Sequence, residues 1–100
     1  MHNQAAEYAK EVAQEIRENT PEDIFEYLEN TLDFVCTVNS SGEYLGARIA
    51  ITLGGPSAWI DTRTGELVVY WGNDTAREWL PGSFIDQLND TLSEYFEMTK

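Results

Sequence analysis

The sequence predicts an α+β fold in which helices pack on one face of a four-stranded antiparallel sheet. Apolar residues recur with helical spacing at both ends of the chain and alternate with polar residues in its middle. Short connections rich in glycine, serine and asparagine separate these segments. The predicted order is ααββββα, and such short connections favour a meander. One hundred residues without a linker-like stretch indicate a single domain covering residues 1–100.

Two helices are predicted in the first third of the chain. The first covers residues 5–18, and its apolar face consists of Ala5, Ala9, Val12, Ala13 and Ile16. A second helix should follow Thr20, a residue type favoured at the N-cap, with Pro21 at the first helical position. We expect it to run to about Thr31. The residues expected to face inward are Ile24, Phe25, Leu28 and Leu32.

Four strands are predicted next. Their ranges are residues 34–38, 43–53, 57–61 and 66–71. The second range alternates, so one side should carry Leu45, Ala47, Ile49, Ile51 and Leu53. Gly65 comes late in a hairpin loop, where a positive φ is often required. After residues 72–74 the chain is expected to be irregular as far as Pro81.

A final helix is predicted after Ser83. This serine is an N-cap residue type, and Asp86 follows three residues later. The apolar stripe of the helix would consist of Phe84, Ile85, Leu88, Leu92, Tyr95 and Phe96.

The most unusual property of the composition is a net charge of −12, from 18 acidic and six basic residues. An apolar content of 42% is high enough for a packed core, which excludes an acidic disordered tail. The negative charge disfavours direct binding to DNA, RNA or an anionic membrane. No apolar run approaches the ~18–20 residues that span a bilayer, and no signal-peptide pattern opens the chain. We therefore expect a cytoplasmic protein.

Twelve of the acidic residues fall into three lines on the predicted helices, each opposite the apolar face. The lines are Glu7, Glu11, Glu15 and Glu18; Glu22, Glu26, Glu29 and Asp33; and Asp86, Asp90, Glu94 and Glu97. Lys10 and Arg17 are the only basic residues in the first two predicted helices. Like charges at i,i+4 destabilise a helix by a few tenths of a kcal/mol per pair, so the lines require an explanation. Solubility, salt adaptation and cation binding are the alternatives that stay open.

The acidic lines predict a surface that imitates the phosphates of a nucleic acid. Neighbouring acids along a helix lie roughly 5–6 Å apart, and each strand of duplex DNA carries one charge per ~3.4 Å. A small acidic chain of mixed α/β order without a catalytic motif resembles the DNA-mimic inhibitors of phages and mobile elements, above all anti-CRISPR and anti-restriction proteins. This resemblance implies a non-enzymatic inhibitor that occupies the nucleic-acid-binding surface of a defence complex in the host bacterial cell. The expected partner is a basic nucleic-acid-binding protein, such as a Cas effector subunit.

A second hypothesis is an immunity protein or antitoxin that blocks a basic nuclease toxin. Aromatic anchors would then contribute alongside the acids. The aromatic residues of the predicted sheet are Tyr44, Trp59, Tyr70 and Trp71, and alternation places some of them on the face without helices. That face could form a second core layer, a protein-contact patch or a homodimer interface.

Other chemistry has little support in the sequence, and we expect neither a cofactor nor a metal. Cys36 is the only cysteine and lies in an apolar run, which favours a buried, inert thiol. His2 is the only histidine, close to the start of the chain. Asp61, Arg63 and Asp74 could gather into a polar cluster, where paired carboxylates are an alternative to a loop ion pair.

Overall fold

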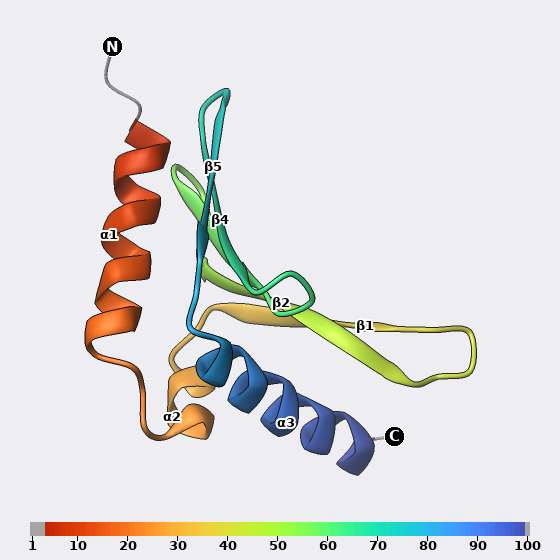
Figure 1. Cartoon of the computed structure of the whole chain (residues 1–100). Coiled ribbons are helices and arrows are strands. Elements are labelled where there is room, and N and C mark those ends of the chain that lie inside the picture. The colour runs from red at the N-terminus through yellow and green to blue at the C-terminus, as the bar shows by residue number, and fades with distance from the viewer. Residues whose placement is uncertain (1–3, 100) are drawn as a thin grey trace.

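The computed structural model describes residues 4–99 and folds them in the order ααβββββα. The helices are α1 (Gln4–Glu18), α2 (Ile24–Glu29) and α3 (Gly82–Met98). The strands are β1 (Asp33–Val38), β2 (Tyr44–Thr52), β3 (Ser57–Asp61), β4 (Glu66–Trp71) and β5 (Asp74–Trp79). Figure 1 shows α1 beside β4 and β5, and α3 alongside β2. The α+β class is confirmed, with one strand more than the sequence predicts.

The five strands form one antiparallel sheet in the order β1-β2-β3-β4-β5. This is the predicted meander, in which each strand pairs with the next one along the chain. The sheet is strongly twisted, so β1 and β5 run in widely different directions (Figure 1). The helices α1 and α3, which cover different parts of this twisted sheet, therefore run in different directions (Figure 1).

The prediction of an irregular segment after residues 72–74 was wrong, because Asp74–Trp79 forms β5. Gly72 and Asn73 connect it to β4, and Gly72 has a φ of 62°, which a tight two-residue hairpin requires at this position. The strand lacks apolar alternation because it lies at the edge of the sheet. Its only small apolar residue, Ala76, is half-buried against the core.

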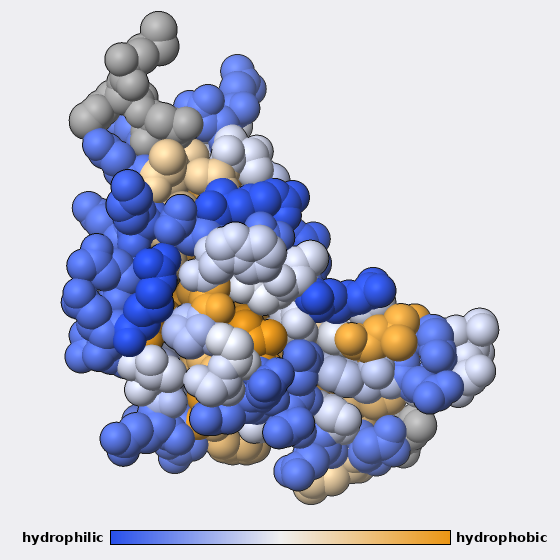
Figure 2. All heavy atoms as spheres, in the orientation of Figure 1, coloured by the Kyte–Doolittle hydropathy of each residue, from blue (hydrophilic) through white to orange (hydrophobic). Residues whose placement is uncertain are grey.

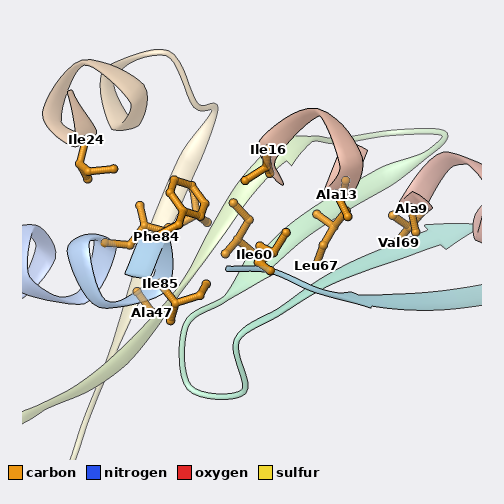
Figure 3. Close-up of a cluster of buried hydrophobic side chains, with 14 of the residues drawn as sticks. Ala9, Ala13, Ile16, Ile24, Ala47, Ile60, Leu67, Val69, Phe84 and Ile85 are labelled. Atoms are coloured by element: carbon orange, nitrogen blue, oxygen red, sulfur yellow. The ribbon is translucent and has the colours of Figure 1, made fainter. Parts of the chain in front are cut away.

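One cluster of buried side chains joins the helices to one side of the sheet. The register places Ile49, Ile60 and Leu67 next to each other across β2, β3 and β4, and all three are fully buried. Figure 3 shows Ala13 and Ile16 of α1 on this side of the sheet, with Phe84 and Ile85 of α3 further along it. The small side chains of α1 at its buried positions let the helix approach the sheet closely. Most of the residues expected in the core are there, and Ala5, Ala9, Ala13, Ile16, Ala47, Ile49, Phe84, Ile85, Leu88 and Leu92 are buried.

Helix α2 is shorter than predicted, and its N-cap is Asp23 instead of Thr20. The carboxylate of Asp23 accepts a hydrogen bond of 3.0 Å from the backbone N–H of Glu26. The Thr20 hydroxyl donates to the carbonyl of Ile16 at 2.8 Å, so it closes the end of α1. Thr20 and Asp23 are both residue types favoured at an N-cap, and the second of them begins the helix.

Helix α3 also begins differently from the prediction. Its cap position is Pro81, which offers no side-chain hydrogen bond, and Ser83 lies within the first turn.

A hydrogen-bond network fixes α3 on the sheet. The Asn89 side chain accepts from the Tyr44 hydroxyl at 2.7 Å and donates to the carbonyl of Thr62 at 3.4 Å. The buried Thr62 hydroxyl accepts from the Ala47 N–H at 2.8 Å.

Several residues of the predicted apolar faces are exposed. They are Phe25, Leu32, Leu45, Leu53 and Tyr95. Leu32 and Leu53 lie just outside α2 and β2, where helical and strand periodicity no longer apply. Leu45 lies where the pairing of β1 with β2 shifts register. Phe25 and Tyr95 have a different explanation, because both line a hollow between α2 and α3.

Candidate partner-binding surface

The first acidic line lies on α1 as predicted. Glu7, Glu11, Glu15 and Glu18 are all exposed and lie opposite the buried side of the helix. The helix rise places the first and last of them roughly 16 Å apart along the axis. Gln14 donates a hydrogen bond of 2.9 Å to Glu18, and Asn19 donates one of 3.2 Å to Glu15. The last two carboxylates of this line thus accept hydrogen bonds from neutral amide side chains.

The basic residues of α1 do not interleave with this line. Arg17 reaches across to Glu78 of β5, with a distance of 3.1 Å between its Nη2 atom and the Glu78 carboxylate. Lys10 is exposed on the same flank of the helix as Arg17. Arg17 therefore pairs with a residue outside the α1 line.

The line on α3 is also present. Asp86, Asp90, Glu94 and Glu97 are exposed, and the opposite side of the helix packs into the core. Both lines therefore project away from the side of the sheet that the helices cover. Figure 2 shows hydrophilic residues over the outer side of α1.

The third predicted line does not exist as one helical row. Glu26 and Glu29 lie on α2, but Glu22 precedes the helix and Asp33 is the first residue of β1. The reason is the late start and early end of α2, which has six residues. All four side chains are exposed, so they add negative charge to this end of the molecule without a regular spacing.

Charge is divided unequally between the helices and the sheet. Residues 4–29 and 82–98 contain twelve acidic and two basic residues, a net charge of −10. Residues 33–79 contain six acidic and three basic residues, a net charge of −3. The side of the sheet away from the helices carries Arg77, which pairs with Glu66 at 3.3 Å, and Arg48, which stacks over the ring of Trp59 at 4.9 Å. Most of the negative charge thus belongs to residues 4–29 and 82–98, which we call the helical layer.

The predicted aromatic residues of the sheet are distributed between its two sides. Tyr44 and Trp71 pack against the core cluster, whereas Trp59 and Tyr70 lie on the opposite side. Tyr70 is exposed on that opposite side. On the core side, burial raises the pKa of Tyr44. Sequence reasoning missed Arg48 beside Trp59, since residues on neighbouring strands come together only through the register.

A groove between α2 and α3 was not predicted. We define the α2–α3 groove as two adjoining hollows that share Phe25 and Thr91. The larger has a volume of about 570 Å³ and an acidic border, and the smaller has about 140 Å³ and a mostly apolar lining. The lining of the larger is Glu22, Asp23, Ile24, Phe25, Gln87, Asp90 and Thr91; that of the smaller is Phe25, Leu28, Glu29, Phe34, Thr91, Leu92 and Tyr95.

The alternative polar cluster of Asp61, Arg63 and Asp74 is not formed. Asp61 accepts a hydrogen bond of 2.9 Å from the backbone N–H of Arg63 and therefore stabilises the hairpin turn. Asp61 pairs with Glu66 at one end of β4, and Asp74 pairs with Trp71 at the other end. The register therefore separates the two carboxylates by almost the whole length of β4.

The remaining candidates for chemistry are as follows. Cys36 was expected to be buried but is only half-buried beside the core, and this burial raises the pKa of its thiol. Within residues 4–99, no group of three or more histidine, cysteine, aspartate or glutamate side chains is arranged to hold a metal ion. His2 lies outside the described residues. No helix in the described part of the chain combines the length and apolarity needed to cross a membrane.

No protein-family model matches the chain, and no curated protein or solved structure shows significant similarity to it.

Proposed function

We propose that this protein is a non-enzymatic inhibitor that occupies the DNA- or RNA-binding surface of a basic protein. The observation that carries the proposal is the pair of exposed carboxylate lines on α1 and α3, which project from the same helical layer. Along each line, neighbouring acids are separated by roughly 5–6 Å of helix axis, a charge spacing of the same order as that of a nucleic-acid strand. Lysine and arginine side chains that normally contact phosphates would contact these carboxylates instead.

The target class follows from the resemblance to anti-CRISPR and anti-restriction inhibitors. A bacterial defence complex, for example a Cas effector subunit, presents an extended basic groove for nucleic acid. The net charge of −10 in the helical layer would also accelerate the encounter with such a groove. The protein itself then needs neither direct contact with nucleic acid nor a cofactor.

A second candidate is an immunity protein or antitoxin that blocks a basic nuclease toxin. The exposed aromatic rings of Phe25 and Tyr95 beside acidic residues favour it. Binding energy in such complexes is usually concentrated in a few buried anchors, whereas a charge mimic distributes it along the surface. The two candidates therefore differ in their response to salt.

The test is retention of partners from a bacterial host lysate on the immobilised protein, followed by competition with a short duplex DNA. We expect the retained partner to bind DNA by itself, to be displaced by the duplex and to elute as NaCl is raised. At 1 M NaCl the Debye length is about 3 Å, so a partner that stays bound would contradict charge mimicry as the main source of affinity.

Three double variants with the same change in net charge locate the surface. They are Glu11→Gln with Glu15→Gln on α1, Asp90→Asn with Glu94→Gln on α3, and Glu43→Gln with Asp74→Asn outside the helices. We expect the first or second variant to weaken retention by about tenfold or more, and the third to have little effect. Equal weakening by all three would show that only the net charge matters.

A further inference from the structure

The α2–α3 groove combines an apolar hollow with an acidic border. In the smaller hollow, Leu92 is almost fully buried, and the walls are the partly exposed rings of Phe25 and Tyr95. Phe34 of β1 supports Tyr95 through an edge-to-face contact with ring centroids 5.7 Å apart. This apolar lining is therefore held in place by three different elements.

The exposure of Phe25 and Tyr95 is unfavourable in the isolated protein. Phe25 is 59% exposed and Tyr95 is 46% exposed, although each follows the apolar spacing of its helix. Covering such rings removes apolar surface from water, which contributes roughly 25 cal/mol per Å². An apolar side chain that entered the smaller hollow would gain this contribution.

The charge around the groove determines which kind of partner fits. Glu22, Asp23 and Asp90 border the larger hollow, and Glu29 borders the smaller one. Among the described residues, no lysine or arginine lines either hollow. A second copy of this chain would bring its own acidic helical layer against these carboxylates, and the repulsion would oppose self-association. A cationic segment would instead gain several attractions at once.

We propose that the α2–α3 groove binds a protein segment in which a large apolar side chain is followed closely by lysine or arginine. The apolar side chain enters the smaller hollow between Phe25 and Tyr95, and the basic group reaches the acidic border of the larger hollow. The proposal rests on the proposed function only for the basic character of the partner. It adds a specific anchor to a surface that otherwise acts through charge.

The test uses two synthetic twelve-residue peptides, one that repeats Leu-Lys-Lys and one that repeats Ser-Lys-Lys. Their charge is the same, and only the first has apolar side chains. We expect the leucine peptide to bind about tenfold more tightly in fluorescence anisotropy and to shift the amide NMR signals of Phe25, Thr91 and Tyr95. Equal affinities, or shifts confined to α1, would overturn the proposal.

Matched variants separate the groove from the rest of the surface. Phe25→Ala should weaken binding of the leucine peptide by about tenfold, and Met98→Ala, at another exposed apolar residue, should not change it. Asp90→Asn should weaken binding more than Glu11→Gln, which removes the same charge from α1. Wild-type affinity of the Phe25→Ala variant would overturn the proposal, as would sedimentation of the free protein as a dimer that this variant dissociates.

The same variants keep this inference distinct from the proposed function. If the natural partner is displaced by DNA and depends on Glu11 and Glu15 but not on Phe25, the charge-mimic function stands and the anchor fails. If the partner depends on Phe25 but is not displaced by DNA, the anchor stands and the mimic function fails.

Discussion

Tyr27 is the residue whose surroundings change its chemistry most. Its ring contacts Phe84 edge-to-face, with centroids 5.4 Å apart, and burial raises its pKa to about 12 from 10.0. The neutral phenol is therefore favoured in the folded protein. The resulting stability is fully present below pH 10 and is lost as the pH rises through 12.

Between pH 8 and pH 11, ionisation of Tyr27 should lower the free energy of unfolding by about 1.4 kcal/mol. The Tyr27→Phe variant lacks this group, so its loss over the same interval should be smaller by that amount. Urea denaturation of both proteins at the two pH values measures the difference. Equal losses would show that Tyr27 is not shielded from solvent in the folded state.

Residue-level predictions from the sequence succeeded where periodicity determines burial. The alanine positions of α1 and most of the apolar stripe of α3 are buried as expected, whereas Tyr95 is exposed and Phe96 is half-buried. Burial of Thr62 could not be predicted, because its hydrogen-bond partners Ala47 and Asn89 are distant in the chain. Phe25 was wrongly expected to face inward. Helical spacing identifies the apolar side of a helix, but it does not show which part of that side packs against another element.

At the scale of elements, α2 depends on its cap. A helix of six residues has few internal hydrogen bonds, so the bond from the Glu26 N–H to Asp23 is a large share of its stability. Asp23→Ala should lower the free energy of unfolding by about 1 kcal/mol. Asp23→Asn should leave it almost unchanged, because asparagine also accepts this hydrogen bond.

Urea denaturation of these two variants, with Glu22→Ala as the neighbouring control, tests the role of the cap. If Asp23→Asn destabilises as much as Asp23→Ala, the charge of Asp23 and not its hydrogen bond stabilises α2. The asparagine variant has a further use, since it removes one charge from the α2–α3 groove while the helix keeps its cap.

Element boundaries also explain which acidic line failed. Lines within α1 and α3 were predictable because each helix spans more than three turns with an uninterrupted apolar side. The line through Glu22 and Asp33 assumed a helix about twice as long as the observed one. Strand β5 was not predicted, because an edge strand composed mainly of charged and polar residues has no apolar alternation to detect.

At the scale of the whole molecule, the helical layer carries a net charge of −10, and its like charges repel each other. The α1 and α3 lines each contain three close pairs at i,i+3 or i,i+4, and each pair costs a few tenths of a kcal/mol at low salt. The free energy of unfolding should therefore rise by about 1–2 kcal/mol between 10 mM and 1 M NaCl, as the Debye length falls from about 30 Å to about 3 Å.

The position of the charges, and not only their number, should determine this effect. Glu11→Gln with Glu15→Gln removes a partner from every close pair of the α1 line, so it should stabilise the protein by about 0.5–1 kcal/mol at 10 mM NaCl and have little effect at 1 M. Glu43→Gln with Asp74→Asn changes the net charge equally but removes no close pair of a line, and it should stabilise less. Urea denaturation of the three proteins at both salt concentrations gives the comparison. If the two double variants respond alike, the repulsion comes from the net charge of the molecule, and the alignment of carboxylates on α1 has no energetic cost for a function to justify.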